Sequence, residues 1–295
     1  ESTATAIRTR IEATYSGFDV RFVVRTDGSD SYKDSLPIDI RTDDSKFVTI
    51  YFNDTPGSGR PGGEASEIDP GNINPGGTAS VQVSGLLGGR EVLNSGLIAV
   101  AASTADGDEI QAPDISKPAA TEENVIALSA KLAAHELGHL LGVRHYDAFG
   151  PVGFGIHAPP GSDRFKPNFV GVTAAFETSD HILSSPASVG TTRFNDLRQL
   201  YFGEREAIKL ALAFSDPTQV RLNESNTEHA TLATAQPLSL VTLNVPNSAS
   251  DSVNEGMKFH VQAITVSGTI DLETSGANSG KSQSDWYSFA GDRGD

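Results

Sequence analysis

Apolar side chains recur at intervals of three and four residues in one long segment near the middle of the chain. This spacing predicts an amphipathic helix over about 121–142. Thr121 is placed to cap its first turn, and Glu122 and Glu123 in that turn complement the positive end of the helix dipole. The apolar positions of this helix are Val125, Leu128, Leu132, Leu137, Leu140 and Leu141.

Shorter apolar runs predict the other elements of the N-terminal part. Three of them predict strands, over Val20 to Arg25, Phe47 to Phe52 and Ala79 to Val83. Two predict helices, over Ile7 to Tyr15 and Arg193 to Phe214. Gly203 is a candidate break in the second of these helices.

The hydrophobic pattern changes character after Asp216-Pro217. Beyond this point, alternation of apolar and polar residues over 264–270 and 285–289 predicts strands. We therefore place a domain boundary here. The predicted division is a first domain of residues 1–217 and a second, β-rich domain of residues 222–295.

The composition restricts the classes of partner. A net charge of −16 argues against nucleic acid and against anionic membrane surfaces. The absence of cysteine excludes disulfides and thiolate metal ligands. No apolar run reaches the roughly 18 residues of a membrane span, and no basic start followed by an apolar stretch indicates a signal peptide. We therefore expect a mature or trimmed product of a longer precursor.

One run of eleven residues, HELGHLLGVRH, combines candidate metal ligands with a candidate base. His135 and His139 are four residues apart, so they lie on one face of the predicted helix. Gly142 can adopt a left-handed conformation and end that helix, which lets His145 reach the same point from outside it. Three imidazoles leave one position of a zinc ion open for water, and Glu136 can accept a proton from that water.

The alternative explanation of this run is a helix with surface histidines that match the pattern by chance. The chain has 7 histidines and 29 glycines in 295 residues. A chance match of all five fixed positions of H-E-x-x-H-x-x-G-x-x-H is therefore remote, and the helical context of the run favours a zinc site.

The run resembles the zinc-binding motif of the metzincin metallopeptidases. The resemblance implies an α+β fold, in which a twisted mixed sheet packs with an active-site helix. It also implies a zinc-dependent endopeptidase with Glu136 as general base, and with His135, His139 and His145 as zinc ligands.

The same resemblance implies residues that contact the substrate or support the metal. The strand over Ala79 to Val83 is expected to be the edge strand that pairs with extended substrate, through Ser80, Val81, Gln82 and Val83. Metzincins also have a methionine in a turn beneath the metal. The only methionine here is Met257, far from the motif, and Leu183 occupies the position that matches best. Because leucine is close to methionine in volume, we expect Leu183 to pack under the metal and to border the substrate pocket.

The C-terminal segment resembles the β-sandwich domains of secreted bacterial peptidases that are sometimes called pre-peptidase C-terminal domains. The matching stretches are Asn223 to Thr227, Ala233 to Leu238, Ile264 to Ile270 and Asp285 to Phe289. Such domains have more strands than residues 222–295 supply, so we expect a truncated, partial sandwich. The resemblance implies a secreted protein of bacterial origin.

Two further sets of side chains are candidates for function. A Gly- and Pro-rich stretch contains oxygen ligands suited to calcium, namely Glu64, Glu67, Asp69, Asn72 and Asn74. A solvated surface loop explains this composition too and is favoured, and the acidic stretch 105–114 lacks the spacing of an EF-hand. His157 and His181 fit a cleft position less well than a surface or packing position.

We therefore predict a secreted, monomeric, zinc-dependent endopeptidase that acts on protein or peptide substrates. The first alternative is a non-catalytic, zinc-containing binding or adhesion protein in which the sandwich binds the partner. An intact Glu136 argues against it, because a structural zinc site has no need of a base. A zinc hydrolase for a non-peptide amide is the second alternative.

Overall fold

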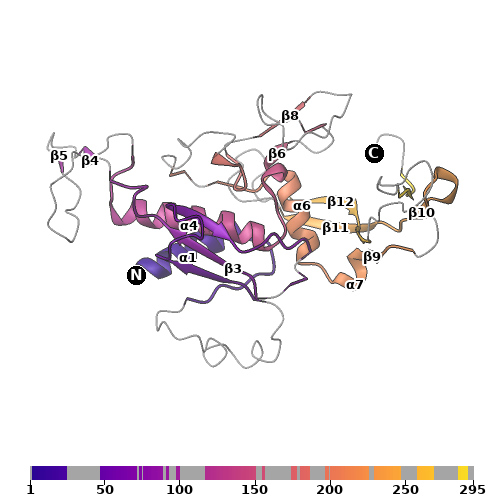
Figure 1. The fold of residues 1–295 in the computed structure, drawn as a ribbon, viewed down its shortest axis with the longest axis horizontal. Coiled ribbons are helices and arrows are strands. Elements are labelled where there is room, and N and C mark those ends of the chain that lie inside the picture. The colour runs from indigo at the N-terminus through magenta and orange to yellow at the C-terminus, as the bar shows by residue number, and fades with distance from the viewer. Residues whose placement is uncertain are drawn as a thin grey trace.

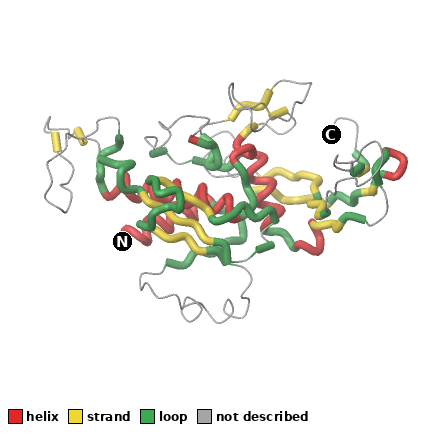
Figure 2. Tube along the Cα trace, in the orientation of Figure 1, coloured by secondary structure: helices red, strands yellow, loops and turns green. Residues whose placement is uncertain are grey.

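In the computed structural model, α-helices combine with several small β-sheets (Figures 1 and 2). The structure describes residues 2–24, 47–71, 73–74, 76–88, 91–92, 98–99, 117–150, 155–156, 174–177, 180–186, 197–198, 200–225, 229–246, 258–268 and 285–291. In these ranges, no helix has both the length and the apolar character needed to cross a membrane. The described part of the chain combines α-helices and β-strands.

Helix α4 (Glu122–Leu140) lies at the centre of the described part and confirms the predicted long helix. The hydroxyl of Thr121 accepts a hydrogen bond from the N–H of Asn124 at 3.2 Å, which is the predicted N-cap. Every side chain from Ile126 to Leu140 is buried. A helix buried on all sides must be covered by several other elements, and these elements determine where its polar side chains point.

Helix α1 (Thr3–Thr14) covers one side of α4. Its residues Ile7 and Ile11 are buried in the contact. Tyr15, which follows α1, is 1% exposed, and its hydroxyl donates to the carbonyl of Ala134 at 2.8 Å. Burial, and then the nearby carboxylate of Glu206, raises the pKa of Tyr15, so the phenol stays protonated and keeps donating.

A three-stranded sheet covers another side of α4. Its strands are β1 (Thr49–Phe52), β2 (Gly62–Ala65) and β3 (Thr78–Gln82), in the order β1-β3-β2. Strand β3 is parallel to β1 and antiparallel to β2. The prediction that residues 79–83 form an edge strand is therefore wrong, because β3 is paired on both sides. In the described part of the chain, β1 and β2 lie at the two edges of this sheet, and β2 is the edge strand that contacts Glu136.

Two predicted elements differ from the structure. Residues 20–24 form no regular strand, although Val20 and Phe22 pack against the core. The predicted helix over 193–214 is confirmed only for its second half, α6 (Glu204–Ala213), and α7 (Pro217–Val220) follows it. Gly203 is the N-cap of α6, and its N–H donates to the side chain of Glu206, so the helix begins there.

The C-terminal strands form two-stranded pairs. Strand β11 (Val241–Pro246) is antiparallel to β12 (Lys258–Ala263). Strand β9 (Arg221–Asn223) is parallel to β13 (Thr265–Ser267). Strand β10 (Gln236–Pro237) is parallel to β14 (Tyr287–Ser288). Strands β13 and β14 lie within the two stretches predicted as strands. The remaining short elements are β4 (Glu91–Val92), β5 (Ile98–Ala99), η1 (His145–Ala148), β6 (Phe149–Gly150), β7 (Gly155–Ile156), β8 (Ala174–Glu177) and η4 (Leu232–Thr234).

One C-terminal strand belongs to the main hydrophobic core. Strand β11 packs on α6, and its residues Leu243 and Val245 join the same core as α1 and α4. The division of the chain between residues 217 and 222 stays a prediction, as does the partial sandwich. The structure adds that β11 and the N-terminal helices share one buried interior.

Candidate metal centre

Helix α4 ends in a cap that turns the chain back toward the helix. Gly142 has a φ of +86°, its N–H donates to the carbonyl of His139 at 2.8 Å, and the N–H of Val143 donates to that of Gly138 at 2.9 Å. These two bonds form a Schellman motif. A Cβ on Gly142 would lie 2.5 Å from Cα of Pro70, so the backbone angle and the close contact both require glycine.

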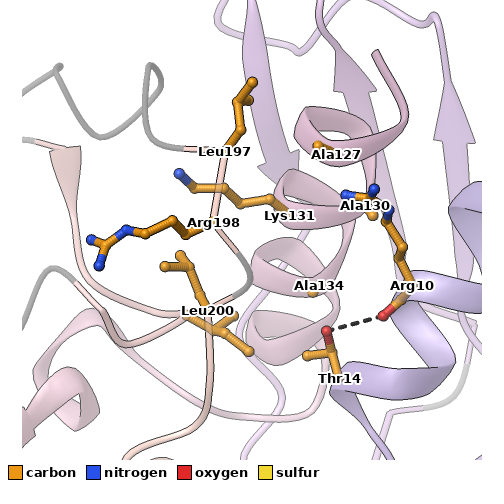
Figure 3. Close-up of a pocket in the computed structure, with 10 residues that line it drawn as sticks. Arg10, Thr14, Ala127, Ala130, Lys131, Ala134, Leu197, Arg198 and Leu200 are labelled. Atoms are coloured by element: carbon orange, nitrogen blue, oxygen red, sulfur yellow. Dashed lines mark hydrogen bonds between the residues drawn. The ribbon is translucent and has the colours of Figure 1, made fainter. Parts of the chain in front are cut away.

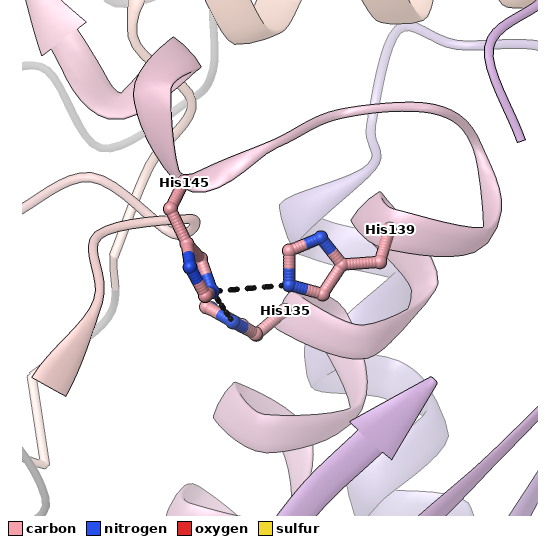
Figure 4. A group of neighbouring side chains, drawn as sticks. All are labelled: His135, His139 and His145. Atoms are coloured by element: carbon pink, nitrogen blue, oxygen red, sulfur yellow. Dashed lines mark hydrogen bonds between the residues drawn. The ribbon is translucent and has the colours of Figure 1, made fainter. Parts of the chain in front are cut away.

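The three histidines of the motif converge on one point (Figure 4). Nε2 of His145 lies 3.2 Å from Nε2 of His135 and 3.2 Å from Nε2 of His139. Ligands of a tetrahedral zinc ion at about 2.0–2.1 Å stand about 3.3 Å apart. The spacing of these nitrogens therefore fits one metal ion, and the predicted grouping of the three histidines is confirmed.

Backbone carbonyls orient two of the three imidazoles. Nδ1 of His135 lies 2.7 Å from the carbonyl of Ile182, and Nδ1 of His139 lies 2.8 Å from the carbonyl of Val143. A carbonyl oxygen only accepts, so each Nδ1 has the proton and each Nε2 keeps its lone pair for a metal. Burial lowers the pKa of His139, which favours the neutral imidazole that a metal needs.

The segment that presents His145 is tied to its neighbours. Asp147 is buried, and its Oδ2 accepts from the N–H of Arg144 at 2.7 Å and from Nζ of Lys209 on α6 at 2.7 Å. Nδ1 of His181 lies 2.8 Å from the carbonyl of Ala148. Although His145 itself is exposed, its backbone is therefore anchored on both sides. His181 has a packing position here, outside the group of converging histidines.

Glu136 lies beneath the edge strand β2. It is 5% exposed, and a Cβ on Gly63 would lie within 3 Å of its carboxylate. Burial raises the pKa of Glu136 to about 8. The backbone hydrogen bond from Ala65 lowers this pKa, and the nearby carboxylate of Glu64 raises it further. The candidate base therefore lies in a dry position between the ligand helix and the edge of the sheet.

Leu183 packs under the ligand helix, as predicted. It is fully buried, and a Cβ on Gly138 would lie 2.7 Å from its Cδ2. Gly138 immediately precedes His139 in α4, so Leu183 supports the helix between the two ligand histidines. A contact of Leu183 with substrate stays a prediction, since its side chain has no exposed surface here.

Glu206 is a residue of this site that the sequence analysis missed. It is fully buried, and its two carboxylate oxygens accept from the N–H of Leu183 at 2.7 Å and from the N–H of Gly203 at 2.5 Å. It thereby connects the start of α6 to the turn whose Ile182 carbonyl orients His135. The available signal was a glutamate three residues after a helix-breaking glycine, which is the capping-box position.

The predicted substrate strand is paired on both sides at Ser80 and Val81, Gln82 pairs with Gly62 of β2, and Val83 follows the strand. Val81 and Val83 are buried, Ser80 and Gln82 are half-buried, and β3 is paired on both sides. Contacts of these four side chains with substrate stay predictions. The reason for expecting them is an exposed strand edge, and in the structure β2 has such an edge, whereas β3 is the middle strand.

The candidate calcium loop is braced by its own side chains. Asp69 is buried and accepts from the N–H of Asn74 at 2.8 Å, while the side-chain amide of Asn74 donates to Glu67 at 2.7 Å. The N–H of Asp69 donates to the carbonyl of His139 at 3.2 Å. Among the described residues, Glu64, Glu67 and Asp69 do not form a converging metal-binding group. Asn72, the stretch 105–114 and His157 lie outside the described residues.

A hollow beside α4 does not include the metal ligands. Its lining includes Arg10, Thr14, Lys131, Leu197, Arg198 and Leu200 (Figure 3). Two of its cations already have acidic partners, because Arg10 pairs with Glu123 and Arg198 pairs with Asp180 at 3.0 Å. We therefore assign the hollow no role in the site.

No family model matches the chain, and no curated protein or solved structure matches it. The residues of the chain itself therefore provide the evidence for its function. The structure shows a group of three histidines that could hold a metal ion. Which metal this group would bind is inferred from the chemistry of the ligands.

Replacing Gly142 by alanine should destabilise the fold and weaken metal binding. The left-handed backbone costs an alanine about 1–2 kcal/mol, and the contact with Pro70 adds roughly 1–3 kcal/mol of overpacking. Gly59→Ala is the matched control, because Gly59 has a φ of +68° and open space around it. Urea unfolding with and without zinc measures both variants, and equal losses would contradict the proposed contact.

Replacing Glu206 by glutamine should destabilise the protein by about 1–3 kcal/mol, because one buried backbone N–H then faces an amide donor. Zinc affinity should fall about tenfold or more, since the turn that orients His135 loosens. Glu204→Gln, in the exposed first turn of the same helix, is the control. Thermal unfolding and zinc titration test this prediction, and unchanged zinc affinity in a destabilised Glu206 variant would limit its role to folding.

Proposed function

We propose that the chain is a zinc-dependent endopeptidase of the metzincin type. The observation that supports this most strongly is the convergence of three histidines, with Nε2 of His145 3.2 Å from Nε2 of both His135 and His139. A buried glutamate, Glu136, directly follows the first of them. Neutral imidazoles are ligands that zinc prefers, and two of them have their protons fixed on the opposite nitrogen. The residues present therefore fit a zinc ion.

A zinc ion in this group would supply a Lewis acid that polarises a peptide carbonyl and makes water more acidic. The chain supplies the proton transfers. The carboxylate of Glu136 accepts a proton from the attacking water and then delivers it to the leaving amine. Its burial under β2 raises its pKa to about 8, close to neutral pH, where one group can both accept and deliver a proton.

The edge of β2 is the proposed docking site for an extended peptide. The N–H of Ser66 donates inward, to the carbonyl of Thr78 at 2.8 Å. Since backbone groups alternate along a strand, those of Gly63 and Ala65 point outward, and the bond between Ala65 and Glu136 agrees with this. In the described part of the chain no strand pairs with that outer side. A substrate strand added there would pass beside the base.

This arrangement supports an enzyme over a non-catalytic zinc protein. Structural zinc sites are usually closed by four protein ligands, whereas the group at the end of α4 has three members among the described residues. The strand edge also favours a peptide over a small amide. The proposal also includes secretion from a bacterium and a monomeric state. These two parts are supported by the resemblance of the sequence to metzincins and to the C-terminal domains of secreted bacterial peptidases.

Replacing Glu136 by glutamine should abolish most cleavage of an unfolded protein substrate and leave zinc content unchanged. Loss of a general base reduces the rate about 100-fold or more, while the three imidazoles stay in place. His145→Ala should lose cleavage together with the zinc equivalent that the three histidines bind. His260→Ala, which removes an exposed histidine of β12, is the control and should lose neither.

Three results would contradict the proposal in different ways. Equal cleavage by Glu136→Gln and the parent would exclude Glu136 as the base. Zinc-loaded parent protein without cleavage of any peptide would favour a binding protein. An unchanged number of zinc equivalents in His145→Ala, relative to the parent, would exclude the three-histidine site.

Replacing Gly63 by alanine should reduce cleavage about 10- to 100-fold without loss of zinc. The new Cβ would lie 2.4 Å from Oε1 of Glu136, so the carboxylate has to move, and small displacements of a catalytic group have effects of this size. Gly62→Ala is the neighbouring control: its φ of +141° strains an alanine, but nothing lies near its Cβ, so it should lose stability without displacing Glu136. Cleavage rates per mole of folded protein test the prediction, and wild-type rates for Gly63→Ala would separate β2 from catalysis.

A further inference from the structure

A second group of metal-ligating side chains lies in the C-terminal part of the chain. Glu224 follows β9, His229 precedes η4, and Asp285 precedes β14. Nε2 of His229 lies 3.0 Å from Oε1 of Glu224 and 3.6 Å from Oδ1 of Asp285. None of these residues takes part in the proposed peptidase chemistry, so the group needs an explanation of its own.

The geometry of this group fits a bound cation, beside the hydrogen bond that Nε2 of His229 can form with Glu224. One ring nitrogen has a single proton or lone pair along one direction, so Nε2 of His229 cannot bond well with two carboxylates at once. The observed separations of 3.0 and 3.6 Å lie on either side of the roughly 3.3 Å expected between ligands of a zinc-sized ion. His229 is only 7% exposed and two carboxylates face it, so a bound dication would compensate their charge while the imidazole stays neutral.

The ligands are held in place before any metal binds. The N–H of Glu224 donates to the carbonyl of Ser267 at 2.8 Å, and the N–H of Trp286 donates to the carbonyl of His229 at 2.9 Å. The hydroxyl of Tyr287 donates to Oε1 of Glu224 at 2.8 Å. This hydrogen bond orients the carboxylate of Glu224.

We propose that Glu224, His229 and Asp285 form a second binding site, for a divalent transition metal of the zinc class. An imidazole among the ligands favours zinc-like ions over calcium or magnesium, which prefer all-oxygen sites. Two carboxylates and a neutral histidine have a charge that a dication balances. Because both carboxylates are partly exposed, water completes the coordination. The ion joins the segment after β9 to the segment before β14, and its binding stabilises that part of the fold.

The test is a zinc titration of the full chain, with cobalt as a spectroscopic probe. The parent should bind two equivalents of zinc, and His229→Ala should bind one and keep its peptidase activity. Asp285→Asn, which preserves shape and removes one charge, should also lose one equivalent. His260→Ala, which removes an exposed histidine on β12, is the matched control and should bind two.

Each outcome decides the proposal. A single equivalent in the parent, lost only in His145→Ala, overturns it. So does a second equivalent that survives in both His229→Ala and Asp285→Asn. If His229→Ala fails to fold by circular dichroism, Asp285→Asn decides alone. A site that binds calcium in the presence of excess zinc overturns the assignment to the zinc class. Failure of the peptidase assay leaves this stoichiometry unaffected, so the two proposals are tested separately.

Discussion

The hydrogen bond between Nδ1 of His135 and the carbonyl of Ile182, at 2.7 Å, is the interaction on which the metal centre depends. It fixes the proton on the side of the ring away from the metal and directs Nε2 toward the other two ligands. The bond forms only if the turn containing Ile182 lies directly under α4. Leu183 maintains that position through its contact with Gly138, and Glu206 maintains it through the N–H of Leu183.

The burial of α4 explains why polar side chains can occupy the interior. A buried imidazole or carboxylate is costly unless its polar atoms have partners. His135, His139 and Glu136 each have a backbone partner, respectively the carbonyls of Ile182 and Val143 and the N–H of Ala65. The elements that cover α4 therefore supply both its hydrophobic contacts and the polar partners that set the protonation and direction of the site.

Features that depend on neighbouring residues could be predicted from the sequence. The N-cap at Thr121, the left-handed Gly142 and the grouping of the three histidines all follow from local spacing, and the structure confirms them. The position of β3 in the sheet could not be predicted, because strand order depends on pairing between distant segments. The helix expected over 193–203 is absent from its described residues, since hydrophobic periodicity does not show that Glu206 caps a later start at Gly203.

The proposed metal binding and the proposed catalysis depend on different parts of the chain. The three ligands lie within eleven consecutive residues on α4 and its C-terminal turn, so the motif itself brings most of the site together. The environment of Glu136 comes from β2, a strand distant in sequence that contributes Gly63 and Ala65. A change in β2 can therefore displace the base while the metal ligands stay in place. For this reason the motif is a sound basis for predicting the metal, whereas the chemistry depends on the fold around it.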